Sequence, residues 1–137
     1  MKTPPPSPSL TPTNPPPAPP SPPSLALGDL LAASQRPDFA WIPFRAGVEE
    51  HRLYGSHQPD ASTASLLRYA PGARIPRHRH VALENIYVLA GSQRDERGTY
   101  RAGALLVNFP GSEHAVVSDE GCTVLAIWER PVVFVDG

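Results

Sequence analysis

The sequence predicts an all-β barrel or sandwich that follows a disordered, proline-rich tail. From Trp41 onward, short segments rich in Val, Ile, Leu and Tyr alternate with Gly, Pro, Asp and Ser turn signals, a rhythm typical of β-sandwiches and barrels. Before that point, twelve of the 19 prolines lie between Pro4 and Pro23. Proline has no backbone N–H, and this stretch has almost no large apolar groups, so we expect no packed structure there.

These observations divide the chain into three parts. Residues 1–24 are expected to form a disordered tail with local polyproline II character. Residues 25–38 form a linker, in which the apolar run Gly28–Ser34 predicts either a short helix or an arm that docks on the barrel. Residues 39–137 form the folded domain. The Pro-x-x-Pro spacings of the tail are nearly unavoidable at this proline density, so they predict no partner.

Strands in the folded domain are expected between turn signals. The turns at Pro71-Gly72, Asp95–Gly98 and Pro110-Gly111 each combine a φ-restricting or polar residue with glycine. The expected strands, which follow the runs of β-branched and aromatic residues, are Trp41–Arg45, Val48–Tyr54, Ser62–Tyr69, Arg77–His80, Asn85–Leu89, Gly98–Arg101, Ala104–Phe109, His114–Ser118, Thr123–Trp128 and Val132–Val135.

Charge and cysteine content exclude several classes of protein. The formal net charge is −1, and because Lys2 is the one charged residue of the tail, residues 25–137 carry −2. No basic stripe is present, so we expect no nucleic-acid partner.

A single cysteine, Cys122, excludes an intramolecular disulfide framework and fits a reducing compartment. No apolar run is long enough for a membrane span or a signal peptide, so a cytoplasmic protein without a membrane partner is expected.

Three polar side chains between Gly72 and Gly91 predict a metal site. His78 and His80 stand at i and i+2, and alternate residues of a strand point to the same face. If the chain turns tightly after His80, Glu84 begins the next strand on that inner face. A hard carboxylate beside two imidazoles is a mixed donor set suited to Fe(II), Mn(II), Ni(II) or Zn(II).

A third histidine completes the expected ligand set. The Pro110-Gly111 turn reverses the chain, so that His114 starts a strand that we expect to face the first pair across the barrel. Three imidazoles and one carboxylate leave one or two coordination positions open for water or another ligand, unlike a closed structural site. The predicted cofactor is therefore one divalent metal ion held by His78, His80, Glu84 and His114.

The spacing of these residues resembles the two cupin motifs. Gly72, His78, His80, Glu84 and Gly91 match the fixed positions of the first motif. The second motif is looser: Gly103, Pro110, Gly111 and His114 match it, whereas Phe109 and Ser118 stand where cupins usually have proline and asparagine. The resemblance implies the double-stranded β-helix, or jelly-roll, barrel of the cupin type and the same four metal ligands.

Within cupins, the chain is most similar to the cupin domain of ChrR-like anti-sigma factors, over about residues 39–130. Those proteins hold their sigma factor with a separate N-terminal zinc domain, whereas residues 1–50 here contain no His or Cys, so a sigma-factor partner is not expected. The segments that carry the likeness are Trp41, Gly47-Val48, Leu67–Gly72, Tyr87–Leu89, Asp95–Gly98, Gly111–His114 and Ser118–Cys122.

Several other side chains are predicted to have structural roles only. His51 lies outside both motifs, and His57 lies in a polar loop that we expect to be solvated, so neither is assigned a function. Cys122 begins an apolar strand, where a free thiol is usually a small buried hydrophobe. Tyr69, Tyr87 and Trp128 are candidates for lining the pocket, but aromatic residues on barrel strands are more often part of the core, which is the role expected for them.

The predicted function is a metal-binding cupin that binds a small molecule in a sensory or regulatory role. The alternative is a metal-dependent dioxygenase or isomerase acting on a small oxygenated substrate. Catalytic residues remain unknown, because no general acid or base is recognisable apart from Glu84.

A small-molecule ligand is the expected partner, and the oligomeric state is left open, with a homodimer as one possibility. The expected interior is apolar and comprises Ile86, Val88, Val116, Val124 and Ala126.

Overall fold

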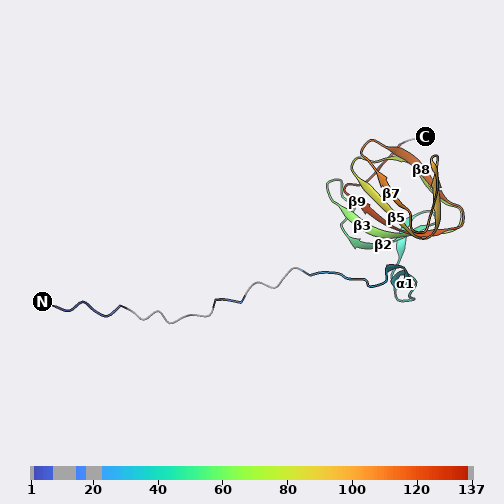
Figure 1. The fold of residues 1–137 in the computed structure, drawn as a ribbon. Helices are drawn as coiled ribbons and strands as arrows, with labels where there is room; N and C mark the ends of the chain where they lie inside the picture. Colours follow the sequence, from blue (N-terminus) through green and yellow to red (C-terminus); the bar gives the residue numbers. More distant parts are fainter. Residues whose placement is uncertain (1, 8–14, 18–22, 136–137) are drawn as a thin grey trace.

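The chain folds into a curled antiparallel barrel, which confirms the predicted all-β jelly-roll class (Figure 1). A computed structural model describes residues 2–7, 15–17 and 23–135. No helix in these ranges is both long and apolar enough to cross a membrane. The elements are α1 (Leu30–Ser34), β1 (Ile42–Arg45), β2 (Val48–Tyr54), β3 (Thr63–Tyr69), β4 (Ala73–Arg79), β5 (Glu84–Asp95), β6 (Gly98–Arg101), β7 (Leu105–Asn108), β8 (Glu113–Ser118), β9 (Cys122–Trp128) and β10 (Val133–Phe134).

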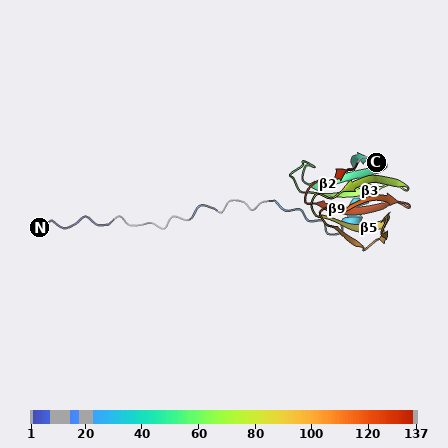
Figure 2. The same ribbon diagram turned by 90° about the horizontal axis from the view of Figure 1, so that it is seen from above.

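Two sheets face one another across the interior. The first has the strand order β1-β2-β3-β9-β5-β7, and Figure 2 shows β2, β3, β9 and β5 side by side. The second has the order β10-β4-β8-β5-β6. All of these pairs are antiparallel, and β5 belongs to both sheets. That shared strand ties the two halves of the barrel together.

β5 changes sheets at Gly91. Up to this glycine the strand pairs with β9, and beyond it the strand pairs with β6 and touches β8. Gly91 has φ +74°, and a Cβ built there would lie 2.0 Å from the carbonyl oxygen of Gly121. Only glycine accepts both the left-handed backbone and this close approach. The predicted end of this strand at Leu89 is therefore wrong, because pairing continues through the glycine to Asp95.

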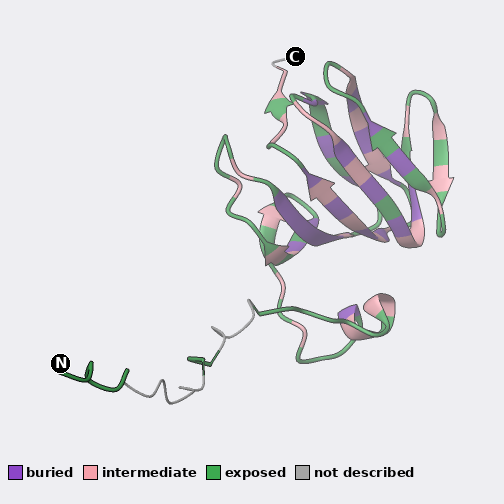
Figure 3. Cartoon of the chain, turned by 60° about the vertical axis from the view of Figure 1, so that its left-hand side comes forward, coloured by how far each residue is buried: buried purple, intermediate pink, exposed green. Residues whose placement is uncertain are grey.

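Alternating burial defines the interior of the barrel. Buried and half-buried residues alternate along β8 and β9, as the striped strands in Figure 3 show. The predicted interior residues are all buried, with exposed fractions of 6% or less. They are Ile86, Val88, Val116, Val124 and Ala126. The period-two pattern therefore identified the inward faces correctly.

The N-terminal segments contribute little to the barrel. Residues 2–7, 15–17 and 23–29 are exposed and lie in no helix or strand, while the other proline-rich residues lie outside the described part. The helix α1 begins two residues after Gly28, because the Asp29 side chain accepts a hydrogen bond from the Ala32 amide at 3.0 Å and caps it. The domain boundary at residue 39 stays a prediction.

Substitution of Gly91 by alanine should destabilise the barrel. The new methyl group would collide with the Gly121 backbone, and we expect a loss of about 3 kcal/mol or more in the free energy of unfolding. Gly98→Ala is the matched control, because a Cβ at that glycine meets nothing within 4 Å. Urea denaturation should show a change of no more than about 0.5 kcal/mol for the control. Equal stability of the two variants would contradict this account of the β5 crossing.

Candidate metal centre

The four predicted ligands come together inside the barrel. His78 lies on β4, His80 directly follows that strand, Glu84 begins β5 and His114 lies on β8. One candidate ligand atom from each side chain lies within 4.8 Å of those of the other three. All four residues are buried, with exposed fractions of 4% or less. The structure therefore assembles a His-His-Glu-His cluster that is able to hold a metal ion.

His114 reaches the cluster from a neighbouring strand. In the β4–β8 pair, His78 and His114 are direct cross-strand partners, and their ring centroids lie 4.6 Å apart. The expectation that His114 faces the first pair from across the barrel is therefore wrong. A register shift between Ile75 and His78 adjusts this pairing near the cluster. The backbone amide of His80 then donates to the Ser112 carbonyl at 2.8 Å, which keeps the two segments together beyond the end of β4.

Each imidazole has a hydrogen-bond partner at its Nδ1 atom. The Nδ1 of His78 lies 2.8 Å from the Pro76 carbonyl, and that of His80 lies 3.0 Å from the Ser112 carbonyl. Because a carbonyl only accepts, these Nδ1 atoms carry the proton and donate it. The Nε2 atoms are then left facing the inside of the cluster, where a metal would bind them in the neutral ring.

Asp95 holds the third imidazole. Its Oδ2 lies 2.9 Å from Nδ1 of His114, and both side chains are buried. Burial by itself raises the pKa of Asp95, but hydrogen bonds from His114, the Arg97 amide and Tyr100 outweigh it and lower the pKa. A charged carboxylate behind a histidine fixes its tautomer and increases its basicity toward a metal. The sequence identified Asp95 only as a turn residue.

Glu84 is buried with both carboxylate oxygens engaged. Oε1 accepts from the Asn108 amide at 2.9 Å and lies 3.0 Å from Nε2 of His80. Oε2 accepts from the Trp128 indole at 2.5 Å. Trp128 is therefore more than the core residue that was expected, because its ring nitrogen orients a predicted ligand. Neither Asn108 nor Trp128 was recognisable from motif spacing.

The pKa values of Glu84 and His78 are shifted toward the forms that bind a cation. Burial by itself raises the pKa of Glu84, but the hydrogen bond with His80 and the nearby imidazoles outweigh it and lower the pKa. Burial lowers the pKa of His78 despite the Pro76 carbonyl and Glu84, which raise it. A carboxylate and neutral imidazoles are the forms that bind metal. The donor set therefore fits one divalent transition-metal ion.

A cavity of about 360 Å³ opens beside the cluster. His78, Glu84 and His114 form part of its wall. The remaining wall is largely apolar and aromatic, and includes Phe44, Leu67, Tyr69, Ile75, Ile86, Val116, Trp128, Val132 and Phe134. A pocket of this size and character holds a small organic molecule, with a few polar groups to orient it.

Three polar side chains of the cavity wall, Arg45, His57 and Gln93, were not identified from the sequence. His57, expected in a solvated loop, lines the cavity and pairs with buried Glu50, so that prediction is wrong. Gln93 also lines the cavity, with an exposed fraction of 3%. The only signal for His57 would have been its pairing with an acid seven residues earlier, which local periodicity does not reveal.

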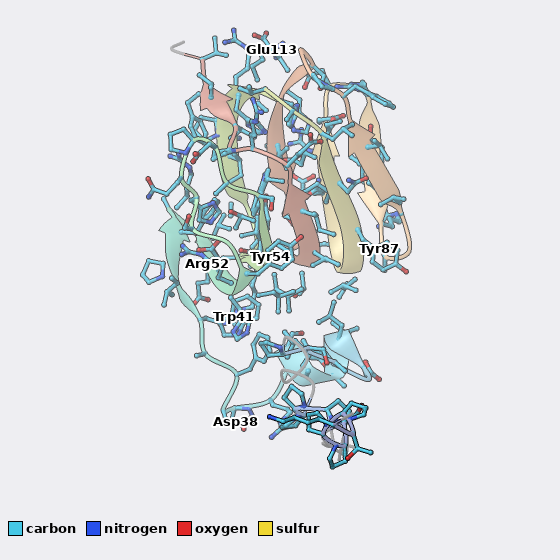
Figure 4. The ribbon with its side chains drawn as sticks, turned by 90° about the vertical axis from the view of Figure 1, so that its left-hand side faces the viewer. Asp38, Trp41, Arg52, Tyr54, Tyr87 and Glu113 are labelled. Carbon is cyan, nitrogen blue, oxygen red and sulfur yellow. The ribbon has the colours of Figure 1, made fainter. Side chains whose placement is uncertain are left out.

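Other candidate residues lie away from the cluster. His51 stacks on Phe39 at 3.7 Å and is hydrogen-bonded to the Ala40 carbonyl, so it holds the segment before β1 and does not line the cavity. Cys122 is a buried core residue, and burial raises the pKa of its thiol to about 11. Tyr87 is 41% exposed and lies at the outer edge of the barrel, which contradicts its predicted core position (Figure 4).

Comparison with known sequences finds a match over most of the chain. Residues 31–130 match the family described as ChrR Cupin-like domain. The anti-sigma-E factor ChrR of Cereibacter sphaeroides is 31% identical over 99 residues, which cover 71% of this chain and 45% of that protein. The chain therefore spans less than half the length of this relative.

Solved structures share the barrel. In the complex of Rhodobacter sphaeroides SigE with the anti-sigma ChrR, the similar chain is 26% identical with a TM-score of 0.61, covering 79% of this chain and 69% of that one. An acetylacetone dioxygenase from Acinetobacter johnsonii has a TM-score of 0.65 at 17% identity, covering 74% and 76%. A putative acetylacetone dioxygenase from Methylibium petroleiphilum has a TM-score of 0.67 at 16% identity, covering 85% and 84%. The two dioxygenases show a shared fold only.

Loss of a ligand should weaken metal binding. We expect His78→Ala and His114→Ala each to lower the affinity for Zn(II) at least about tenfold, because one arm of the chelate is removed. Competition with a chromophoric chelator measures this affinity. His51→Ala, a histidine outside the cavity, should bind metal like the wild-type protein. Full metal occupancy in both ligand variants would show that the ligand set is wrong.

Asp95 provides a separate test of the outer hydrogen bonds. Asp95→Asn keeps the shape of the side chain but removes the charge behind His114, and we expect Zn(II) affinity to fall about tenfold or more. The matched control is Asp119→Asn, since Asp119 is an exposed partner of Arg94. Chelator competition on both variants should leave the control unchanged. Equal affinities would mean that Asp95 does not act on the metal site.

Proposed function

This chain belongs to the ChrR cupin-like family, and from that premise we propose that it is a metal-binding cupin domain that holds a small molecule beside the metal in a sensory or regulatory role. The proposed ligands are His78, His80, Glu84 and His114. The observation that carries the proposal is the cavity, which opens directly against three of these residues. A structural metal would need no such space.

The donor set suits Zn(II), Fe(II), Mn(II) or Ni(II). A divalent ion in this site supplies a Lewis acid that polarises an oxygen atom of the bound molecule. The charge that balances the ion and the surface that contacts the small molecule come from the chain's own residues. Glu84, whose charge is held by Asn108 and Trp128, balances the cation, and the apolar wall favours a ligand of modest polarity.

The regulatory part of the proposal is supported by kinship with a protein named as an anti-sigma factor. A sigma factor is not the partner that we propose. The proposed signal is instead the small molecule itself, read through occupancy of the cavity.

A metal-dependent dioxygenase or isomerase acting on a small oxygenated substrate is the second candidate. The observation that favours it is His57, a titratable side chain in the wall of the same cavity. Sequence analysis found no acid or base apart from Glu84, and catalysis generally needs one near the reacting atoms. His57 therefore supplies a group that the sensory function does not require.

Oxygen uptake separates the two candidates. We expect the Fe(II)-loaded protein to bind acetylacetone, followed by the change in its ultraviolet spectrum, without sustained oxygen consumption. His80→Ala is the control, because free iron also consumes oxygen with diketones. Steady consumption that depends on substrate and disappears in His80→Ala would replace the sensory function by the dioxygenase.

The Glu84→Gln variant tests the role of Glu84. If Glu84 is a metal ligand, as we expect, the variant should bind metal more weakly. If Glu84 were instead a general base, the variant would keep its metal and lose turnover.

A further inference from the structure

Half-buried His57 and buried Glu50 form a second polar pair at the cavity wall. Glu50 on β2 is 2% exposed, and its carboxylate is hydrogen-bonded to Nε2 of His57. His57 in turn lines the cavity beside the His-His-Glu-His cluster. The His57 imidazole therefore lies next to the cavity, and the Glu50 carboxylate lies behind it, further into the protein. A histidine oriented by a buried carboxylate is the arrangement that proteins use to accept and return protons.

The carboxylate of Glu50 is held from three directions. Ser65 donates to Oε2 at 2.7 Å and Arg52 donates to Oε1 at 3.2 Å, in addition to the His57 contact. Burial by itself raises the pKa of Glu50, but these partners outweigh it and lower the pKa. Arg52 lies on the side of the barrel formed by β1 and β2 (Figure 4). The charged carboxylate therefore accepts a hydrogen bond from Nε2–H of His57.

The loop between β2 and β3 fixes the orientation of His57. Its backbone has φ +56°, and it is the one residue other than glycine with a positive φ in the described ranges. Its amide donates to Thr63 Oγ1 at 3.2 Å. The ring packs against Phe44 and edge-on against Trp128, at centroid distances of 5.6 and 5.3 Å. With Nε2 engaged, Nδ1 has no partner among the described residues and is available as a proton acceptor.

Gln93 is a further polar residue of the cavity wall. It lines the cavity on β5, and its Oε1 is buried without any hydrogen-bond partner among the described residues. His57 and Gln93 thus place two polar functions in the same wall as the metal cluster.

We propose that His57, positioned by Glu50, is the proton acceptor of this cavity, and that its ligand is a weakly acidic enol or hydroxyketone bound as its anion. This inference rests on the proposed function, because it requires the ligand to lie in the same cavity as the metal. On binding, the O–H bond of the ligand breaks and the proton moves to Nδ1 of His57. The electron pair stays on the oxygen, which becomes an oxyanion facing the metal cluster. The Glu50 carboxylate balances the resulting imidazolium.

Proton counting tests this step without relying on turnover. Maltol is a suitable probe, because its enolic hydroxyl is protonated at neutral pH and its anion chelates divalent metals. Calorimetric titration of the Zn(II)-loaded protein in buffers of different ionisation enthalpy measures the protons released per maltol bound. The ultraviolet spectrum of the bound probe reports whether it is an anion. Zn(II) avoids oxidation of the probe during the measurement.

We expect the wild-type protein to bind maltol as the anion and to release almost no protons, because His57 retains the proton. His57→Asn should release about one more proton per maltol than the wild-type protein. Asparagine tolerates positive φ, so this variant should fold normally. Glu50→Gln should shift the count in the same direction, since the imidazolium loses its counter-charge. His51→Asn, which alters a histidine outside the cavity, should match the wild-type protein.

The outcomes that overturn the two proposals differ. Failure to take up Zn(II), or to bind maltol once Zn(II) is bound, would overturn the proposed function and this inference with it. Metal and maltol binding with equal proton release in the wild-type protein and His57→Asn would overturn only the role of His57. Maltol bound in its neutral form would do the same. In those cases the Glu50–His57 pair merely fastens the loop between β2 and β3.

Discussion

The buried carboxylate of Glu84 is the constraint on which the rest of the site depends. An ion removed from water costs several kcal/mol unless hydrogen bonds and opposite charges replace the lost hydration. Asn108 on β7, Trp128 on β9 and His80 after β4 supply those contacts, and each comes from a different part of the sheet. The register of these elements relative to β5 therefore has to satisfy this charge as well as apolar packing.

The same strand organises the cluster at both of its ends. β5 begins with Glu84 and ends with Asp95, which holds the His114 ring from behind. Both contacts require the strand to leave one sheet and enter the other, and Gly91 allows this by accepting a left-handed backbone against Gly121. The carbonyls of Pro76 and Ser112 orient the remaining two imidazoles. The four candidate ligands are thus held in place by contacts within the protein itself.

The cavity combines an apolar wall with a small number of polar groups whose hydrogen bonding is incomplete. The aromatic rings of Phe44 and Trp128 form part of that wall, and apolar surroundings strengthen the electrostatic interactions of nearby polar groups. His57 and Gln93 stand in the same wall as the metal cluster. This combination is what a site needs to select a ligand by its acidity as well as its shape. It is compatible with a sensor that stops at binding and with an enzyme that continues to chemistry.

What the sequence by itself determined was local. Alternation of apolar residues identified the inward faces, and the spacing of His78, His80 and Glu84 placed three ligand candidates on them, because a strand sends alternate side chains to one side. Tertiary structure decided which of those faces meet. Asp95 and His114 are 19 residues apart, Glu84 and Trp128 are 44 apart, and Glu50 reaches His57 only through a loop with a left-handed residue. Such contacts depend on strand register and on where β5 crosses between sheets. The alternation of apolar and polar residues within one strand reveals neither of them.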